Sequence, residues 1–72
     1  MGRLAGISGK QAVAAFCRAG YQVSRQKGSH LILRREGWPH LVIPMHRSVA
    51  PFLLRSQVRR AGLSEEAFLE LL

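Results

Sequence analysis

The chain's 72 residues are enough for one domain with a small core and too few for a second folded unit, so we expect a single domain over residues 1–72. Its composition, 47% apolar and 21% charged, excludes a disordered or fibrous chain. Eleven lysines and arginines against four acidic residues give a formal net charge of +7, which predicts a polyanionic partner: nucleic acid, an acidic protein or an anionic membrane face.

The beginning of the chain carries no recognisable targeting signal. Lys10 interrupts the apolar residues that follow Arg3, and no apolar run reaches the length of a membrane span. Cys17 is the only cysteine, which excludes an internal disulfide and fits a reducing compartment. We therefore expect a soluble cytoplasmic protein with no membrane partner, in which Cys17 belongs to the core.

The basic residues are concentrated before residue 64. All eleven lysines and arginines lie in residues 1–63, where Glu36 is the only acidic residue, so this part has a formal charge of +10, eleven positive charges less one negative. A solvated surface normally mixes both signs. The asymmetry therefore favours an anionic partner over a basic surface kept for solubility.

Residues 9–19 are predicted to form the first helix. Ser8 can cap its N-terminus and Gly20 its C-terminus. The apolar residues at helical spacing are Val13, Phe16 and Cys17. Lys10 and Arg18 fall on the polar side of this helix.

Three extended segments follow, at residues 21–26, 30–35 and 40–44. They are rich in branched and aromatic residues, and turn signals stand between them at Lys27-Gly28 and at residues 36–39. The sequence therefore predicts a three-stranded antiparallel meander.

The two faces of the second strand differ in character. Leu31 and Leu33 share one face, which we expect to meet the core. On the opposite face, His30 and Arg34 flank Ile32.

A second helix is predicted from Pro51 to about Ala61, with Gly62 just past its end. Its core stripe consists of Leu54, Val58 and Ala61. Arg55 and Arg59 are four residues apart, and a like-charge pair at this spacing destabilises an isolated helix by about 0.2–0.5 kcal/mol. An anion docked there would relieve the repulsion.

Ser64 can cap a short final helix, whose Glu65 and Glu66 suit the positive end of the helix dipole. The residues expected to face inward are Phe68, Leu71 and Leu72. The order is α-β-β-β-α with a terminal helical turn. It predicts an α+β fold in which helices cover one face of the sheet.

Familiar metal and cofactor patterns are absent from the sequence. His30, His40, His46 and Cys17 lack the spacing of metal ligands. Phosphate-loop and dinucleotide motifs do not occur, and the chain has no aspartate for a Ser-His-Asp triad. We expect neither a metal site nor a cofactor.

His30 stands out because its neighbours could support RNA cleavage. Lys27, Gly28 and Ser29 supply a cation, an approachable backbone and a hydroxyl. RNA carries its own nucleophile, so a neutral imidazole can take the 2′-hydroxyl proton while cations stabilise the phosphorane. The ordinary alternative is that His30 only begins a strand and packs beside Ile32.

Three segments, from the first helix to the last, carry a recognisable ordered set of motifs. The segments are GYQVSRQKGSHLILRR (20–35), VIPMH (42–46) and LLRSQVRRAGLSEEAFLEL (53–71). The motifs within them are Gly28-Ser29-His30, Pro44-x-His46 and Arg-Ala-Gly-Leu-Ser at residues 60–64. This set resembles the HicA family of toxins, small ribonucleases paired with HicB antitoxins. The resemblance implies a fold like that of double-stranded-RNA-binding domains, translation-independent mRNA cleavage with His30 as the catalytic histidine, and neutralisation by a HicB-type antitoxin.

Residues around His30 are further candidates for the site. His46 matches the family, as a second proton-transfer or phosphate-binding group or as a residue that fixes the strand end. The expected RNA contacts are Lys27, Gly28, Ser29, Arg34, Arg47, Arg55 and Arg59.

Trp38 either stacks on a base or covers an edge of the core, and His40 is expected at the surface. Family members usually have Gly-Thr where Phe52-Leu53 stands here, so the approach to the second main helix is expected to differ.

Two other classes of function stay open at this point. One is a non-catalytic RNA-binding module that uses the same basic surface for shape recognition. The other is a DNA-binding helix-turn-helix over residues 53–72. It is disfavoured because the helix that would enter the major groove has three glutamates and no basic residue.

Overall fold

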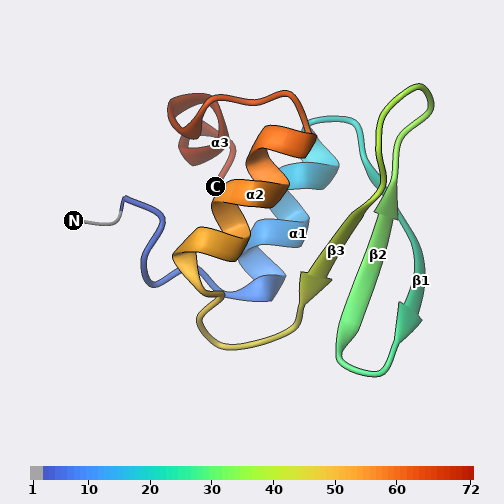
Figure 1. Cartoon of the computed structure of the whole chain (residues 1–72), viewed down its shortest axis with the longest axis horizontal. Helices are drawn as coiled ribbons and strands as arrows, with labels where there is room; N and C mark the ends of the chain where they lie inside the picture. Colours follow the sequence, from blue (N-terminus) through green and yellow to red (C-terminus); the bar gives the residue numbers. More distant parts are fainter. Residues whose placement is uncertain (1–2) are drawn as a thin grey trace.

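The computed structural model describes residues 3–72. They contain three helices and three strands (Figure 1). The helices are α1 (Gly9–Arg18), α2 (Pro51–Arg60) and α3 (Glu65–Glu70). The strands are β1 (Gln22–Lys27), β2 (His30–Arg34) and β3 (Leu41–Pro44). The predicted order and the α+β fold are confirmed.

The strands form an antiparallel sheet in the order β1-β2-β3. Figure 1 shows α1 and α2 next to each other on one side of this sheet, with α3 beside them. Both α1 and α2 contact β3, and α3 contacts α2. One face of the sheet is therefore covered by helices and the other is open.

The helix boundaries follow from the predicted caps. The Ser8 hydroxyl accepts a hydrogen bond from the Gln11 amide at 3.0 Å, and the Gln11 side chain accepts one from the Ser8 amide at 2.9 Å, which forms a capping box. The Ser64 hydroxyl accepts from the Ala67 amide at 3.0 Å. No helix within residues 3–72 is both long and apolar enough to cross a bilayer.

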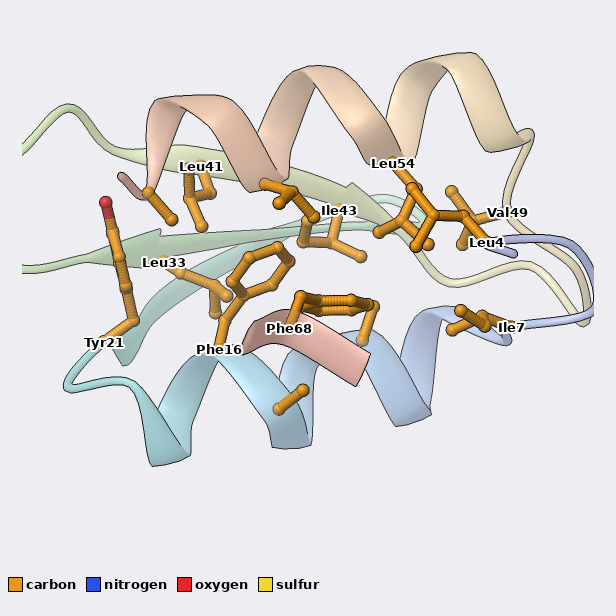
Figure 2. Packing of buried hydrophobic residues seen from close by; sticks show 14 residues of the cluster. Leu4, Ile7, Phe16, Tyr21, Leu33, Leu41, Ile43, Val49, Leu54 and Phe68 are labelled. Atoms are coloured by element: carbon orange, nitrogen blue, oxygen red, sulfur yellow. The ribbon is translucent and has the colours of Figure 1, made fainter. Parts of the chain in front are cut away.

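The core lies between the sheet and the helices, with two phenylalanines near its centre (Figure 2). The ring centroids of Phe16 in α1 and Phe68 in α3 are 5.0 Å apart, and Tyr21 meets Phe16 edge-on at 6.3 Å. Arg18 donates a hydrogen bond to the Leu71 carbonyl at 2.6 Å and so ties the end of α3 to α1. The sheet and α2 add the buried residues Leu33, Leu41, Ile43, Leu54 and Val58.

Two residues expected in the core are instead exposed. Cys17 lies at the surface, because the buried face of α1 is centred on other positions. That face consists of Gly9, Ala12, Ala15 and Phe16. Cys17 follows Phe16 and so points about 100° further round the helix. Leu72 is 46% exposed, because it lies beyond the end of α3.

The two edge strands of the sheet, β1 and β3, are protected from further pairing in different ways. Gln57 of α2, which is buried, accepts a hydrogen bond from the Val42 amide at 3.1 Å, so α2 covers the outer edge of β3. All six residues of β1 are exposed, and the register shifts between Val23 and Arg25. Such a bulge with charged neighbours discourages pairing with a further strand.

Candidate functional site

His30 is the first residue of β2 and lies between the ends of two other strands. It pairs with Lys27 of β1 across a two-residue turn, and with Pro44 of β3 on its other side. Gly28 in that turn has a φ of +62°, a conformation that favours glycine. Directly opposed residues of antiparallel strands have Cβ atoms about 4.5–5.5 Å apart. The turn therefore places the side chains of His30 and Lys27 opposite each other on the same face of the sheet.

The segment that follows β3 is held at the same end of the sheet. The Met45 amide donates a hydrogen bond to the Ser29 carbonyl at 2.7 Å, and the Gly9 amide donates one to the His46 carbonyl at 2.9 Å. Gly9 packs so closely here that a Cβ would overlap the Pro44 carbonyl oxygen and come within 2.8 Å of the Met45 Cα. His46 is therefore anchored two residues beyond the strand partner of His30. Its side chain and that of Arg47 are exposed.

His30 belongs to the open face of the sheet. Alternation along β2 puts Leu33, which is fully buried, and Leu31, which is partly buried, on the covered face. Ile32 and Arg34 share the open face with His30. No enclosed pocket was found within residues 3–72, so any ligand of His30 would bind across a surface rather than inside a cleft.

The structure brings together only part of the predicted set of contacts. The residues at the His30 end of the sheet are Lys27, Gly28, Ser29, His46 and Arg47. Arg34 lies at the other end of β2, about 13 Å from His30 at the usual rise of a strand. Arg59 is exposed on α2, and Arg55 of the same helix is turned to α3.

Arg55 already has an anionic partner inside the molecule. Its Nε lies 2.9 Å from a carboxylate oxygen of Glu65, the first residue of α3. The chain itself thus offsets part of the expected repulsion between Arg55 and Arg59. The pair is substantially exposed and contributes about 0.2–1 kcal/mol.

A family model described as the HicA toxin of bacterial toxin–antitoxin systems matches residues 9–63. The chain belongs to the HicA toxin family. The match runs from α1 to just past α2 and so includes the Gly28-Ser29-His30 turn and His46. This HicA-family chain is accordingly a toxin of a toxin–antitoxin system. A comparison with curated proteins found no match.

The toxin has a second group of basic and aromatic residues, at the end of β2 away from His30. The Cζ atom of Arg35 lies over the Trp38 ring, 5.1 Å from its centroid. Trp38 also packs on Gly62, where a Cβ would lie 2.5 Å from the indole Cη2. Arg60 donates to the His40 carbonyl from Nε at 3.3 Å and from Nη2 at 3.1 Å. The sequence pointed to Trp38, but not to its contacts with Arg35 and Gly62.

Tyr21 links this second group to the core of the toxin. Its hydroxyl donates a hydrogen bond to the Pro39 carbonyl at 2.9 Å. Burial raises the pKa of Tyr21 above its usual value, while the guanidinium groups of Arg35 and Arg60 act in the opposite direction. Both arginines therefore lie close enough to the phenol for their positive charges to lower its pKa.

The remaining histidine lies apart from the other two. His40 is exposed, as predicted, in the turn before β3. Within residues 3–72, no three His, Cys, Asp or Glu side chains meet in an arrangement that could hold a metal ion.

Proposed function

We propose that this toxin is an endoribonuclease that cleaves single-stranded mRNA by histidine acid–base catalysis without a metal ion, and that His30 is its catalytic residue. The observation that supports this most is the pairing of His30 with Lys27 at an exposed end of the open sheet face. A histidine whose cross-strand neighbour is a lysine suits a substrate that develops negative charge at phosphorus. Membership of the HicA family gives independent support.

In the proposed reaction the RNA supplies the nucleophile. His30 in its neutral form accepts the proton of a 2′-hydroxyl, and the 2′-oxygen attacks the adjacent phosphorus. The bond from phosphorus to the 5′-oxygen breaks, and that oxygen takes up a proton. The products are a 2′,3′-cyclic phosphate and a 5′-hydroxyl. One proton-transfer group of this kind contributes about 10²–10⁴-fold in rate.

The neighbours of His30 would stabilise the phosphorane. Lys27 supplies a positive charge directly across the strand pair. At Gly28 nothing lies within 4 Å of the position a Cβ would take, so a phosphate can approach the backbone of the turn and the Ser29 hydroxyl. Hydrogen bonds to a charged group such as a phosphate are about twice as strong as hydrogen bonds between neutral groups.

His46 and the arginines have supporting roles in this proposal. His46, anchored at the same end of the sheet, would donate the proton to the departing 5′-oxygen or bind the phosphate. Arg47 and Arg34 would contact the RNA backbone on either side of the cleaved bond. Arg59 and Arg55 would add only to the general positive field, the latter weakly because Glu65 neutralises it.

A HicB-type antitoxin would neutralise the toxin by covering the surface that bears His30. That surface is open, without a pocket in the described residues, and lies in a chain segment with ten more basic than acidic residues. An acidic protein surface is complementary to it and would exclude RNA from the same charges.

The test compares the wild type with His30→Ala in cells, scored for growth arrest and mRNA decay. His40→Ala is the matched control, since it removes another exposed histidine, at the other end of the sheet. We expect the wild type and His40→Ala to arrest growth and degrade mRNA, and His30→Ala to do neither while still binding RNA. If His30→Ala remains toxic, the proposal is wrong and a non-catalytic RNA-binding module becomes the better explanation.

A further inference from the structure

We propose that the toxin has a second RNA contact, the tryptophan cluster, formed by Tyr21, Arg35, Trp38, Arg60 and Gly62. In this cluster the Trp38 ring, which has the Arg35 guanidinium over it, receives a nucleobase of the bound strand, and Arg60 binds a neighbouring phosphate. The inference rests on the proposed function, because it extends the RNA site that begins at His30.

The geometry of Trp38 suits stacking better than a purely structural role. Its indole rests on Gly62 and carries Arg35 on the ring, yet 43% of the residue remains exposed. Trp38 is not part of the buried core cluster. An exposed aromatic ring beside an arginine offers a flat surface to an unpaired base, and every base has a face that can stack on it.

The charges of the cluster lack an internal partner. The Arg55–Glu65 pair is the only ion pair within residues 3–72, so neither Arg35 nor Arg60 is neutralised by a carboxylate there. Arg35 lies over Trp38, and Arg60 donates to the carbonyl of His40, two residues further along the same turn. An anion bound beside these two cations would be attracted by both charges.

Arg60 is held in a position from which it can still bind a phosphate. Its Nε and Nη2 atoms donate to the His40 carbonyl, and no hydrogen bond is formed by its Nη1 atom within residues 3–72. The bond to His40 fixes the guanidinium, so less side-chain entropy is lost when a phosphate arrives. The cluster thus offers a stacking surface and a fixed cation side by side.

The position of the cluster suits an extension of the His30 site. Arg35 is the first residue after β2 and stands five residues after His30, about 17 Å at the usual rise of a strand. Arg34 is the last residue of β2 and shares the open face with His30, whereas the Arg35 side chain lies beside Gly20 at the end of α1, on the helix side. A single strand of RNA that presents a phosphodiester bond to His30 would therefore pass Arg34 and turn around the end of β2 to reach Trp38 with a base several nucleotides away.

The protein contains its own reporter for this contact, since Trp38 is the only tryptophan. The experiment uses the full chain with His30→Ala, so that RNA is bound without being cut. A labelled single-stranded RNA oligonucleotide measures binding by fluorescence anisotropy, and the unlabelled oligonucleotide is titrated against the emission of Trp38. We expect saturable quenching of the emission with the same midpoint as the anisotropy. Binding with unchanged emission would overturn the inference and leave the proposed function intact. Absence of any RNA binding would overturn both.

Substitutions in the same background give a second readout. Trp38→Ala is expected to weaken RNA binding by about 5- to 150-fold, the usual range for loss of one base stack. Trp38→Phe should retain most of the affinity, because a ring remains. Phe52→Ala is the matched control, since Phe52 is 75% exposed on α2 and should not affect affinity. Equal losses in Trp38→Ala and Phe52→Ala would contradict a specific stack. Unchanged affinity in Trp38→Ala would assign the surface to a protein partner and overturn the inference.

Discussion

Replacing Gly9 with alanine should destabilise the protein, although the same change stabilises most helices. Gly9 is buried in the first turn of α1, where a Cβ would overlap the Pro44 carbonyl oxygen and approach the Met45 Cα to 2.8 Å. Both obstacles are backbone atoms, which cannot rotate away as a flexible side chain can. Either α1 or the segment after β3 must move, and that movement would strain the hydrogen bond from the Gly9 amide to the His46 carbonyl.

The opposing contributions to the effect of Gly9→Ala can be compared. Alanine is favoured over glycine inside a helix by about 0.5–1 kcal/mol. Inserting a methyl group into a closely packed site costs about 1–3 kcal/mol, and a weakened hydrogen bond costs about 0.5–1.5 kcal/mol more. The net expectation is a loss of about 0.5–4 kcal/mol in the free energy of unfolding. For a domain of this size each kcal/mol lowers Tm by about 4–8 °C.

Urea denaturation measures this loss directly, with Lys10→Ala as the matched control. Lys10 is the next residue of α1 and is exposed, so its replacement should change stability by no more than about 0.5 kcal/mol. Gly9→Ala should also shift the NMR signals of His46, because the His46 carbonyl accepts a hydrogen bond from the Gly9 amide. If Gly9→Ala instead raised stability by the usual helix preference, the close contact between α1 and the end of β3 would be refuted.

Three further substitutions test other parts of the fold. Gln57→Leu leaves the Val42 amide without an acceptor and should lower the free energy of unfolding by about 1–3 kcal/mol in chemical denaturation. An unchanged free energy would show that α2 does not protect this edge of the sheet. Tyr21→Phe removes the bond to Pro39 and should cost about 0.5–1.5 kcal/mol at neutral pH. Burial raises the pKa of Tyr21, so above about pH 10 the phenol ionises more readily in the unfolded chain than in the folded one. The wild type should therefore lose stability as the pH rises above this value, and Tyr21→Phe should lose less. An equal dependence of stability on pH in the two proteins would contradict this. Cys17→Ser should change Tm by little, and a loss of several degrees would mean that Cys17 is buried after all.

Local signals in the sequence predicted the elements well because their causes are local. Ser8 and Ser64 cap helices through bonds to amides three residues away. The short turn at Gly28 fixes which residues face each other, so the neighbourhood of Lys27 and His30 could be anticipated from the sequence. Alternation along β2 correctly separated the open face from the covered one.

Contacts between distant parts of the chain could not be predicted in the same way. A helical pattern leaves the exact direction of its buried face uncertain, which is why Cys17 was wrongly placed in the core. The ion pair of Arg55 with Glu65 depends on how α3 packs beside α2. The contact of Trp38 with Gly62 likewise joins segments that only the folded chain brings together. These contacts decide which basic residues remain free for a ligand.

The role of His30 as the proton acceptor is tested most directly by the chemistry of the cut ends. Purified protein is incubated in EDTA with a single-stranded RNA, and with the same RNA carrying a 2′-deoxynucleotide at the cleaved position. We predict that the RNA is cut to leave 5′-hydroxyl ends, that the 2′-deoxy position stays intact, and that His30→Ala cuts neither substrate. Cleavage that requires a divalent cation and leaves 5′-phosphates, or that proceeds at the 2′-deoxy position, would contradict the proposed mechanism.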